Sequence, residues 1–399
     1  MKVELSDRSY GFTKIQKKDW ILIVGLCLAP MTGLRIWKVG PGEILCLLWG
    51  MKNLLTFFSS RSDISKFFIF FILSLGAGSF WGYMIAPNEL RISDLITWLY
   101  LGVITILVYE GLKKNNLPYN EKILFLFAQA AVIWYLFLYV YSKLISRIFF
   151  GAPLWYGGIR FSGGGTNPHQ IAVLLCSLCA IFLRELFRTR NKITCILGIA
   201  ISLFLLIQTQ SSTGLLAVVV SYVFFAFYSI GHFAPGRQKN IYSILICFML
   251  LILIIGYGTF SSLLINWIAD DSNGIGRIEI FKTFSIAFGK SPLFGLGPGI
   301  HGRNGTIEFH NTYLEVLAAT GIIGGFIFFK YSILLFKKVF KADWMLLPIL
   351  VSIYAYGLAG FAMRRLVYWG IVAFISVISE QMILSLSEDE SQSINIVGE

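Results

Sequence analysis

The feature that most constrains this chain is its series of long, uninterrupted apolar segments. Many of them run for about 17–25 residues, the length that an α-helix needs to cross the hydrocarbon core of a bilayer. Of the 399 residues, 56% are hydrophobic and only 14% are charged. A water-soluble domain needs more polar surface than this. We therefore expect an all-α, polytopic integral membrane protein for which lipid is the main solvent.

The apolar runs predict about 12 transmembrane helices. The expected ranges are 20–36, 41–58, 67–87, 93–112, 122–146, 170–188, 192–208, 213–231, 241–262, 310–336, 344–362 and 366–386. Lys52 interrupts the second of these ranges. No internal repeat or second domain is visible, so residues 1–399 are expected to form a single membrane domain.

The basic residues indicate how the chain is oriented. The net charge is +12, but Lys and Arg are scattered between the apolar runs rather than gathered on one domain, which argues against a nucleic-acid partner. With the N-terminus inside, more than half of the 33 Lys and Arg residues fall on the inner segments and the adjoining helix ends. Cytoplasmic loops of membrane proteins are enriched in these residues. Both termini are therefore expected to be cytoplasmic.

Two segments on the expected outer face are too long to be simple turns. Residues 147–169 are rich in Gly, Trp and Tyr, and residues 263–309 form a long loop before the tenth expected span. Within the second segment, residues 278–288 carry apolar side chains at helical spacing, which predicts a short amphipathic helix at the membrane interface. Because long loops in compact proteins are often functional, their polar residues are the main candidates for a site.

Three side chains in these outer segments suit transfer chemistry. Arg160 and Arg277 offer planar guanidinium forks that match phosphate oxygens. His310 lies where the second segment enters a helix, and an imidazole can take a proton near neutral pH. Such a set would suffice for glycosyl transfer from a polyprenyl pyrophosphate donor. Simpler roles stay open, because Arg160 can anchor the chain at the interface and a histidine at a helix start can cap the helix.

No metal or cofactor is expected. All six cysteines lie in apolar stretches, and the Cys-x-x-Cys spacing of Cys176 and Cys179 has no second ligand pair, whereas zinc sites need polar tetrahedral surroundings. The outer segments lack an Asp-x-Asp sequence; Asp270 and Asp271 are adjacent, which makes a poorer metal pair.

Residues 276–324 resemble the O-antigen ligase and O-antigen polymerase superfamily. That family has an Arg that opens an outer-loop helix, a Pro-x-x-Gly-x-Gly turn, a His-Asn-x-Tyr/Phe-Leu sequence and a Gly-Ile/Leu-Gly step. The matching elements here are Arg277, Pro292-Leu-Phe-Gly295-Leu-Gly297, His310-Asn311-Thr-Tyr313-Leu314 and Gly321-Ile-Ile-Gly324. The upstream outer-loop motif of the family is similar to Arg160…Gly163…Asn167-Pro168.

The chain departs from the family pattern at two places. Residues 211–214 read Ser-Ser-Thr-Gly where the family often has Ser-Arg-Thr/Ser-Gly, so one basic group is missing near that turn. Position 169 is His where Asn is commoner in the family. Arg364 and Arg365, which begin another helix on the outer side, are candidates for supplying the missing charge.

The resemblance implies a glycan donor carried on undecaprenyl pyrophosphate, in the outer leaflet of a bacterial inner membrane. It implies a metal-independent, inverting transfer in which His310 is the base on the acceptor hydroxyl. Arg277 would be catalytic and would bind the pyrophosphate together with Arg160 and Asn311. The further candidate site residues are Asn167, His169, Arg303, Arg364 and Arg365.

Three functions stay open. A polymerase of O-antigen, capsule or another surface polysaccharide would use a second lipid-linked repeat unit as acceptor. A ligase would use lipid A-core or a protein. A lipid-linked oligosaccharide flippase is the third alternative; transporters commonly have two related halves with charges at the membrane midplane, and neither is visible here. The short stretch between residues 299 and 310 favours the polymerase.

Overall fold

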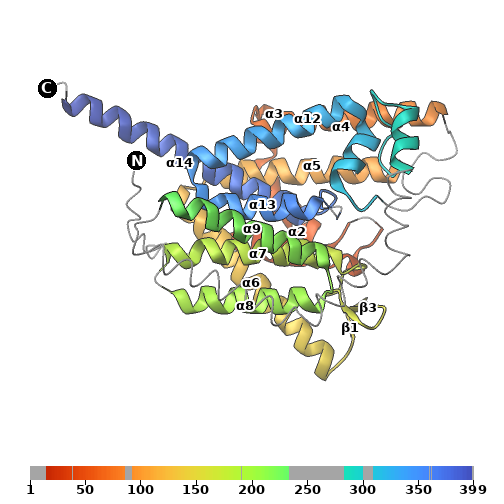
Figure 1. The fold of residues 1–399 in the computed structure, drawn as a ribbon, viewed down its shortest axis with the longest axis horizontal. Helices are drawn as coiled ribbons and strands as arrows, with labels where there is room; N and C mark the ends of the chain where they lie inside the picture. Colours follow the sequence, from red (N-terminus) through yellow and green to blue (C-terminus); the bar gives the residue numbers. More distant parts are fainter. Residues whose placement is uncertain are drawn as a thin grey trace.

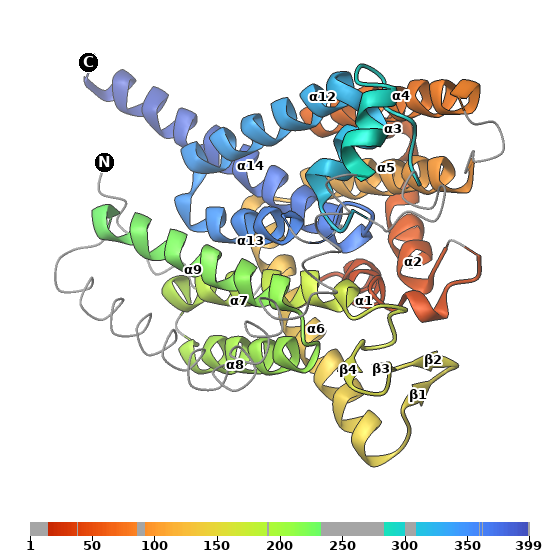
Figure 2. The same cartoon turned by 45° about the vertical axis from the view of Figure 1, so that its right-hand side comes forward.

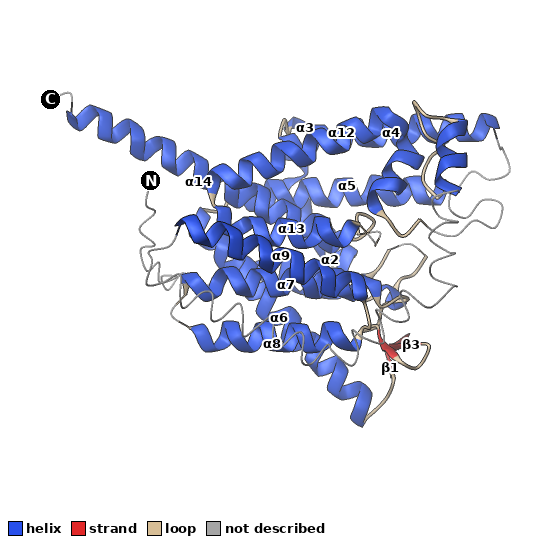
Figure 3. Cartoon of the chain, viewed as in Figure 1, coloured by secondary structure: helices blue, strands red, loops and turns tan. Residues whose placement is uncertain are grey.

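The computed structural model describes residues 15–37, 39–85, 92–189, 191–232, 283–299, 309–358, 360 and 362–397. In these residues twelve α-helices and a further helical segment at residues 283–290 make up nearly all of the regular structure, and the strands are only two residues long (Figure 1, Figure 3). The prediction of an all-α, polytopic membrane protein is confirmed.

The helices follow the chain in simple order. They are α1 (Asp19–Leu28), α2 (Pro41–Gly50), α3 (Leu54–Ser59), α4 (Asp63–Ile85), α5 (Ile92–Lys113), α6 (Leu117–Leu144), α7 (His169–Arg188), α8 (Lys192–Gln208), α9 (Ser212–His232), α12 (Thr312–Ala342), α13 (Leu347–Gly357) and α14 (Leu366–Val397). Short 3₁₀ turns η1 (Thr32–Leu34), η2 (Met51–Asn53) and η5 (Trp344–Leu346) connect some of them. Between α6 and α7, β1 (Ile148–Phe149) pairs antiparallel with β2 (Ala152–Pro153), and β3 (Trp155–Tyr156) with β4 (Arg160–Phe161).

Seven of the described helices are long and apolar enough to cross a membrane: α4, α5, α6, α7, α9, α12 and α14. Three shorter apolar stretches, Asp19–Leu28, Lys192–Gln208 and Trp344–Gly357, lie beside them. The expected span at 241–262 lies outside the described residues. The total of about 12 spans therefore stays a prediction.

Some boundaries differ from the expected ones for local reasons. α1 ends at Leu28 rather than near residue 36, because Pro30 has no N–H to continue the helical ladder. The expected span 41–58 is divided: α2 ends at Gly50, and η2, which contains Lys52, separates it from α3. α13 ends at Gly357, several residues before the expected end.

The helices lie side by side and give the molecule two distinct ends (Figure 1, Figure 2). We call the end that carries β1–β4, residues 291–299 and the first residues of α7, α9, α12 and α14 the loop end. The opposite end, where α7 and α12 finish and α6 begins, is called the ion-pair end. Helices that are joined by short connections, such as α4 and α5 or α7 and α8, pack side by side and run in opposite directions.

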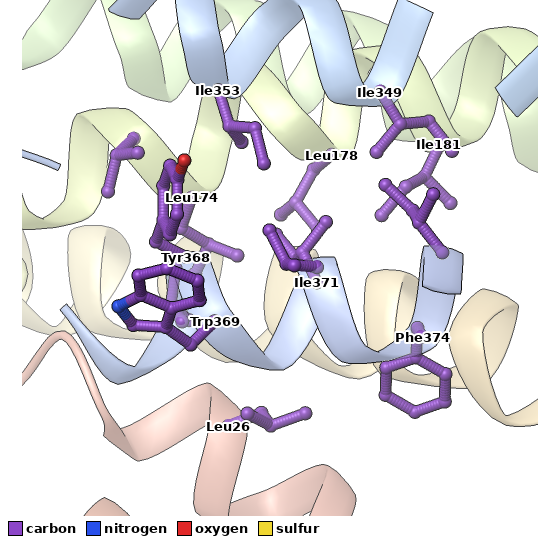
Figure 4. Close-up of a cluster of buried hydrophobic side chains, with 14 of the residues drawn as sticks. Leu26, Leu174, Leu178, Ile181, Ile349, Ile353, Tyr368, Trp369, Ile371 and Phe374 are labelled. Carbon is purple, nitrogen blue, oxygen red and sulfur yellow. The ribbon is translucent and has the colours of Figure 1, made fainter. Parts of the chain in front are cut away.

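The core is formed by helices that neighbouring helices cover almost completely. In the most apolar window of α7, 94% of the residues are buried inside the protein. Leu174 and Leu178 of α7 pack with Ile353 of α13 and Trp369 of α14 (Figure 4). A helix that is buried on nearly all sides is held rigidly at both of its ends. The first residue of α7 is His169, so this packing fixes one of the candidate site residues.

Candidate functional site

Arg160 is anchored at the loop end by backbone oxygens. Its Nε donates to the carbonyl of Thr209 at 3.0 Å, and its Nη2 donates to the carbonyl of Gln210 at 3.3 Å. These carbonyls belong to the tight turn between α8 and α9, where Gln210 has a φ of +51°. A guanidinium has five N–H donors, so these two bonds orient Arg160 and leave donors for a ligand.

The charge of Arg160 lies in a partly dehydrated place. Burial lowers the pKa of this guanidinium, and its electrostatic interaction with Tyr356 opposes that effect. Among the residues that the structure describes, no carboxylate forms an ion pair with Arg160. A buried cation that is held by neutral carbonyls favours a bound anion.

His169 and His310 come together at the same end. Their ring centroids are 6.2 Å apart, with an angle of 46° between the ring planes. His169 is the first residue of α7, and His310 lies just before α12. The two residues are far apart in the sequence, so tertiary packing creates this pair: α13 packs against both α7 and α12.

A tyrosine from a third helix holds His169. The Tyr356 hydroxyl, on α13, lies 3.2 Å from Nδ1 of His169 and donates to the backbone carbonyl of the same residue at 3.0 Å. Tyr356 also interacts electrostatically with Arg160 and Arg365. Tyr356 thus links the histidines to the arginines of the loop end. No sequence pattern points to Tyr356, because this residue lies within an apolar run.

His310 has an uncommon backbone conformation. Its φ is +46°, in the left-handed region that side chains other than Gly seldom adopt. The next residue, Asn311, is the N-cap of α12: its Oδ1 accepts from the N–H groups of Tyr313 and Leu314, and its Nδ2 donates to the carbonyl of Leu358 at 2.7 Å. These bonds hold His310 in place from the side of the helix.

The glycine motifs form a backbone junction beside His310. α12 opens at Gly321, whose φ and ψ are 63° and −162°. Segment 292–297 inserts there: two of its N–H groups donate to the carbonyls of Ala318 and Ala319 at 2.9 Å each, and the carbonyl of Pro292 accepts from Ile322 at 2.8 Å. The kink of α12 and segment 292–297 therefore supply each other's backbone groups with hydrogen-bond partners.

This junction has no room for side chains. A Cβ on Gly78 of α4 would lie 2.3 Å from the oxygen of Ala319, and a Cβ on Gly295 would lie 2.4 Å from the backbone nitrogen of Thr320. These glycines let backbone approach backbone. Their role here is to position the start of α12.

Other predicted site residues have structural contacts. Asn167 accepts a hydrogen bond from the backbone N–H of His169 at 2.9 Å and so caps α7. Arg364 forms an ion pair with Asp94 of α5 at 3.2 Å. Arg365 lies next to it at the start of α14 and interacts with Tyr356. Arg277 and Arg303 lie outside the described residues.

The second outer segment is described only in part. Residues 283–290 are helical, and they overlap the amphipathic helix predicted at 278–288. Ala287 is buried with Leu296, Phe309 and Ala318 in a small apolar cluster, while Ile286 is 63% exposed. This helix therefore packs one face against the start of α12, next to His310.

Several helices begin at the loop end, among them α7, α9, α12 and α14. A helix N-terminus carries a partial positive charge and free N–H groups, so it favours anions. Together with Arg160 and Arg365, this makes the loop end electrostatically suited to an anion.

In the described residues, no cluster of three or more His, Cys, Asp or Glu side chains has the arrangement of a metal site. The described cysteines are buried as free thiols among apolar side chains.

Comparison with known families bears on this site. The O-antigen ligase family model matches residues 197–329, from α8 to the kinked part of α12. No curated protein matches the chain. The matched range includes His310, Asn311 and the glycine junction.

The predicted resemblance is thus confirmed by an independent match over the same motifs. The family supports a membrane enzyme of the polymerase or ligase type that acts in polysaccharide biosynthesis. Residues 197–329 of this chain are therefore similar to the O-antigen ligase family, which supports the resemblance to the O-antigen ligase and polymerase superfamily.

Proposed function

We propose that this protein transfers a glycan from undecaprenyl pyrophosphate to a sugar hydroxyl, and that the acceptor is a second lipid-linked repeat unit. The protein would then be a surface-polysaccharide polymerase of the bacterial inner membrane, active on the periplasmic side. The observation that carries the proposal is the meeting of Arg160, His169 and His310 at one end of the bundle, where the N-termini of α7, α9, α12 and α14 also lie.

The proposed reaction needs one proton acceptor and one stabilised leaving group. The acceptor hydroxyl oxygen attacks the anomeric carbon of the donor sugar, and its proton passes to the imidazole of His310. The bond between that carbon and the pyrophosphate oxygen breaks, and undecaprenyl pyrophosphate leaves with the electron pair. Attack from the side opposite the leaving group inverts the anomeric configuration.

The developing charge on the pyrophosphate would be stabilised by groups that are already oriented. Arg160 is fixed by two backbone carbonyls, so it loses little freedom when it binds phosphate oxygens. Arg277 is proposed to supply a second guanidinium. Asn311 caps α12, so we propose that it contributes by holding the helix start toward the pyrophosphate. No step in this scheme requires a metal ion.

The strained backbone of His310 supports its assignment as the base. A left-handed φ at a residue other than Gly costs about 1–3 kcal/mol, and such strain gathers at active sites. Here the surrounding bonds of Asn311 and the packing of residues 283–290 maintain it.

The His310→Ala variant tests the base. Turnover should fall by about 10²–10⁴, the range that general-base catalysis contributes. The measurement is glycan transfer by purified protein in nanodiscs, with the amount of folded protein checked by gel filtration. The control is His232→Ala, because His232 ends α9 away from the site. Wild-type turnover in His310→Ala would refute the assignment.

Orientation is tested separately. A reporter fused after Asp270 should be periplasmic, and one fused after Lys192 should be cytoplasmic, because the inner segments carry the excess of Lys and Arg. A cytoplasmic reporter at Asp270 would remove the proposed function, since the lipid-linked donor would face the wrong side.

A ligase is the second candidate, and the matched family is itself described as an O-antigen ligase. The two functions differ in the surface glycan of a deletion strain. A lipid A-core that bears one repeat unit indicates a polymerase, and a core without any repeat indicates a ligase. An unchanged glycan would contradict both.

A further inference from the structure

The Tyr356 hydroxyl decides which nitrogen of His169 carries a proton. A phenol has one hydrogen to donate, and Tyr356 donates it to the backbone carbonyl of His169 at 3.0 Å. The second contact of this hydroxyl, 3.2 Å from Nδ1 of His169, then requires the ring nitrogen to be the donor. In the neutral imidazole the proton is therefore on Nδ1.

This tautomer determines the chemistry of the other ring nitrogen. When Nδ1 carries the proton, Nε2 has a lone pair and accepts hydrogen bonds. Nδ1 faces α13, so Nε2 is directed away from that helix. A phosphate oxygen is only an acceptor and is repelled by such a nitrogen, whereas a sugar hydroxyl is a donor that it attracts.

The position of His169 places this acceptor nitrogen beside the proposed base. The imidazoles of His169 and His310 have ring centroids 6.2 Å apart, so both can reach hydroxyl groups of one sugar. Arg160, which favours anions, lies at the same end and is held by the carbonyls of the α8–α9 turn. The loop end thus has a cationic part and a hydrogen-accepting part.

We propose that His169 binds a hydroxyl of the acceptor sugar through Nε2, and that Tyr356 is the positioning residue that fixes the tautomer and orientation of His169. This inference rests on the proposed glycan transfer and assigns the two sides of that site: Arg160 to the donor pyrophosphate and His169 to the acceptor glycan.

The tautomer is tested without any activity. The chain has only four histidines, so histidine-selective ¹⁵N labelling in nanodiscs gives a simple NMR spectrum, and the His169→Gln variant assigns the His169 signals. Above neutral pH the wild type should show a protonated Nδ1 and an unprotonated Nε2 for His169. In Tyr356→Phe this preference should weaken. A wild-type spectrum with the proton on Nε2 would overturn the inference.

The acceptor role is tested by kinetics with two different substrates. A lipid-linked repeat unit with a blocked acceptor hydroxyl serves only as donor, and a repeat unit without the pyrophosphate serves only as acceptor, so each is varied separately. His169→Gln and Tyr356→Phe should raise the KM for the acceptor, the latter by about two- to tenfold for one lost hydrogen bond. The KM for the donor should stay unchanged. Tyr135→Phe is the matched control: it removes a hydroxyl that donates to a backbone carbonyl, that of Cys27, in the core.

The outcomes separate the two proposals. If the wild type transfers glycan and the two variants change the donor KM, or neither KM, the acceptor role of His169 is wrong and the proposed function stands. If the wild type transfers no lipid-linked glycan, the proposed function fails and the inference fails with it. A rise confined to the acceptor KM supports both.

Discussion

The two ends of this helical bundle use arginine in opposite ways. At the ion-pair end, Arg184 is 1% exposed and bonds to Glu121 at 2.6 Å, to Glu185 at 2.8 Å and to Asp343 at 3.0 Å. At the loop end, Arg160 is held by neutral carbonyls instead. A cation surrounded by carboxylates is already neutralised and holds helices together. A cation held by carbonyls keeps its charge for a ligand.

A second ion-pair group strengthens this contrast. Lys338 of α12 bonds to Asp63 of α4 at 2.9 Å and to Glu380 of α14 at 2.8 Å. Three helices far apart in the sequence are thus joined at the ion-pair end. The loop end differs: His310 and Gly321 have positive φ angles there, and glycines are frequent. Such backbone conformations are expected where a site is built from loops.

The largest loss of folding stability should come from a substitution at the ion-pair end. Replacing Arg184 by Ala leaves buried carboxylates without their partner, which costs about 3–5 kcal/mol of stability. Thermal unfolding in detergent should show a large fall in Tm and in the yield of folded protein. Lys192→Ala, an exposed change at the start of α8, is the control and should lie within about 0.5 kcal/mol of wild type. A stable Arg184→Ala protein would contradict the structural role of this end.

The second largest loss of stability should come from a substitution in the glycine junction. Gly78→Ala should destabilise the protein by about 1–3 kcal/mol through overpacking, because the new Cβ meets backbone atoms of α12 and of segment 292–297. Gly76→Ala is the matched control on the same helix, where a Cβ meets nothing within 4 Å. The readouts are Tm and glycan transfer, and transfer should fall with Gly78→Ala because His310 is displaced. Equal behaviour of the two variants would refute a tight junction.

The smallest of the three effects concerns the arginine of the loop end. Arg160→Lys should leave Tm nearly unchanged and reduce transfer about tenfold, or about 1.4 kcal/mol in the barrier. An ammonium has no planar fork, so it cannot hold two carbonyls and a phosphate together. Arg277→Lys should also leave Tm nearly unchanged, and it should reduce glycan transfer more than Arg160→Lys does.

Lys290→Arg is the control for the arginine variants, since Lys290 is exposed on the helix of residues 283–290. It should be nearly silent. If Arg160→Lys keeps wild-type transfer, then Arg160 is an interface anchor, for which a long cationic side chain is sufficient.

The distribution of basic residues along the sequence did not predict the ion pairs of Arg184. The sequence suggested that Arg184 and Arg188 only orient the chain toward the cytoplasm. The structure buries Arg184 in an ion-pair network whose acids come from α6, α7 and the turn after α12. Periodicity along the chain cannot reveal such a partner, because the contact depends on how the helices pack.

The sequence by itself determined the membrane class, the helical content, the approximate position of most helices and the resemblance to a known family. Those properties follow from the length and composition of individual segments, so they depend only on residues that are close together in the sequence. It also identified Arg160, His169 and His310 as candidates, since polar residues in outer segments are few.

Only the tertiary structure decided what these residues do to one another. It placed His169 beside His310, brought Tyr356 from an apolar run to fix one imidazole, and turned the glycine motifs into a backbone junction. These relations depend on distances between residues far apart in the chain. The physical reason is that close packing of α7, α12 and α13, rather than any local pattern, determines those distances.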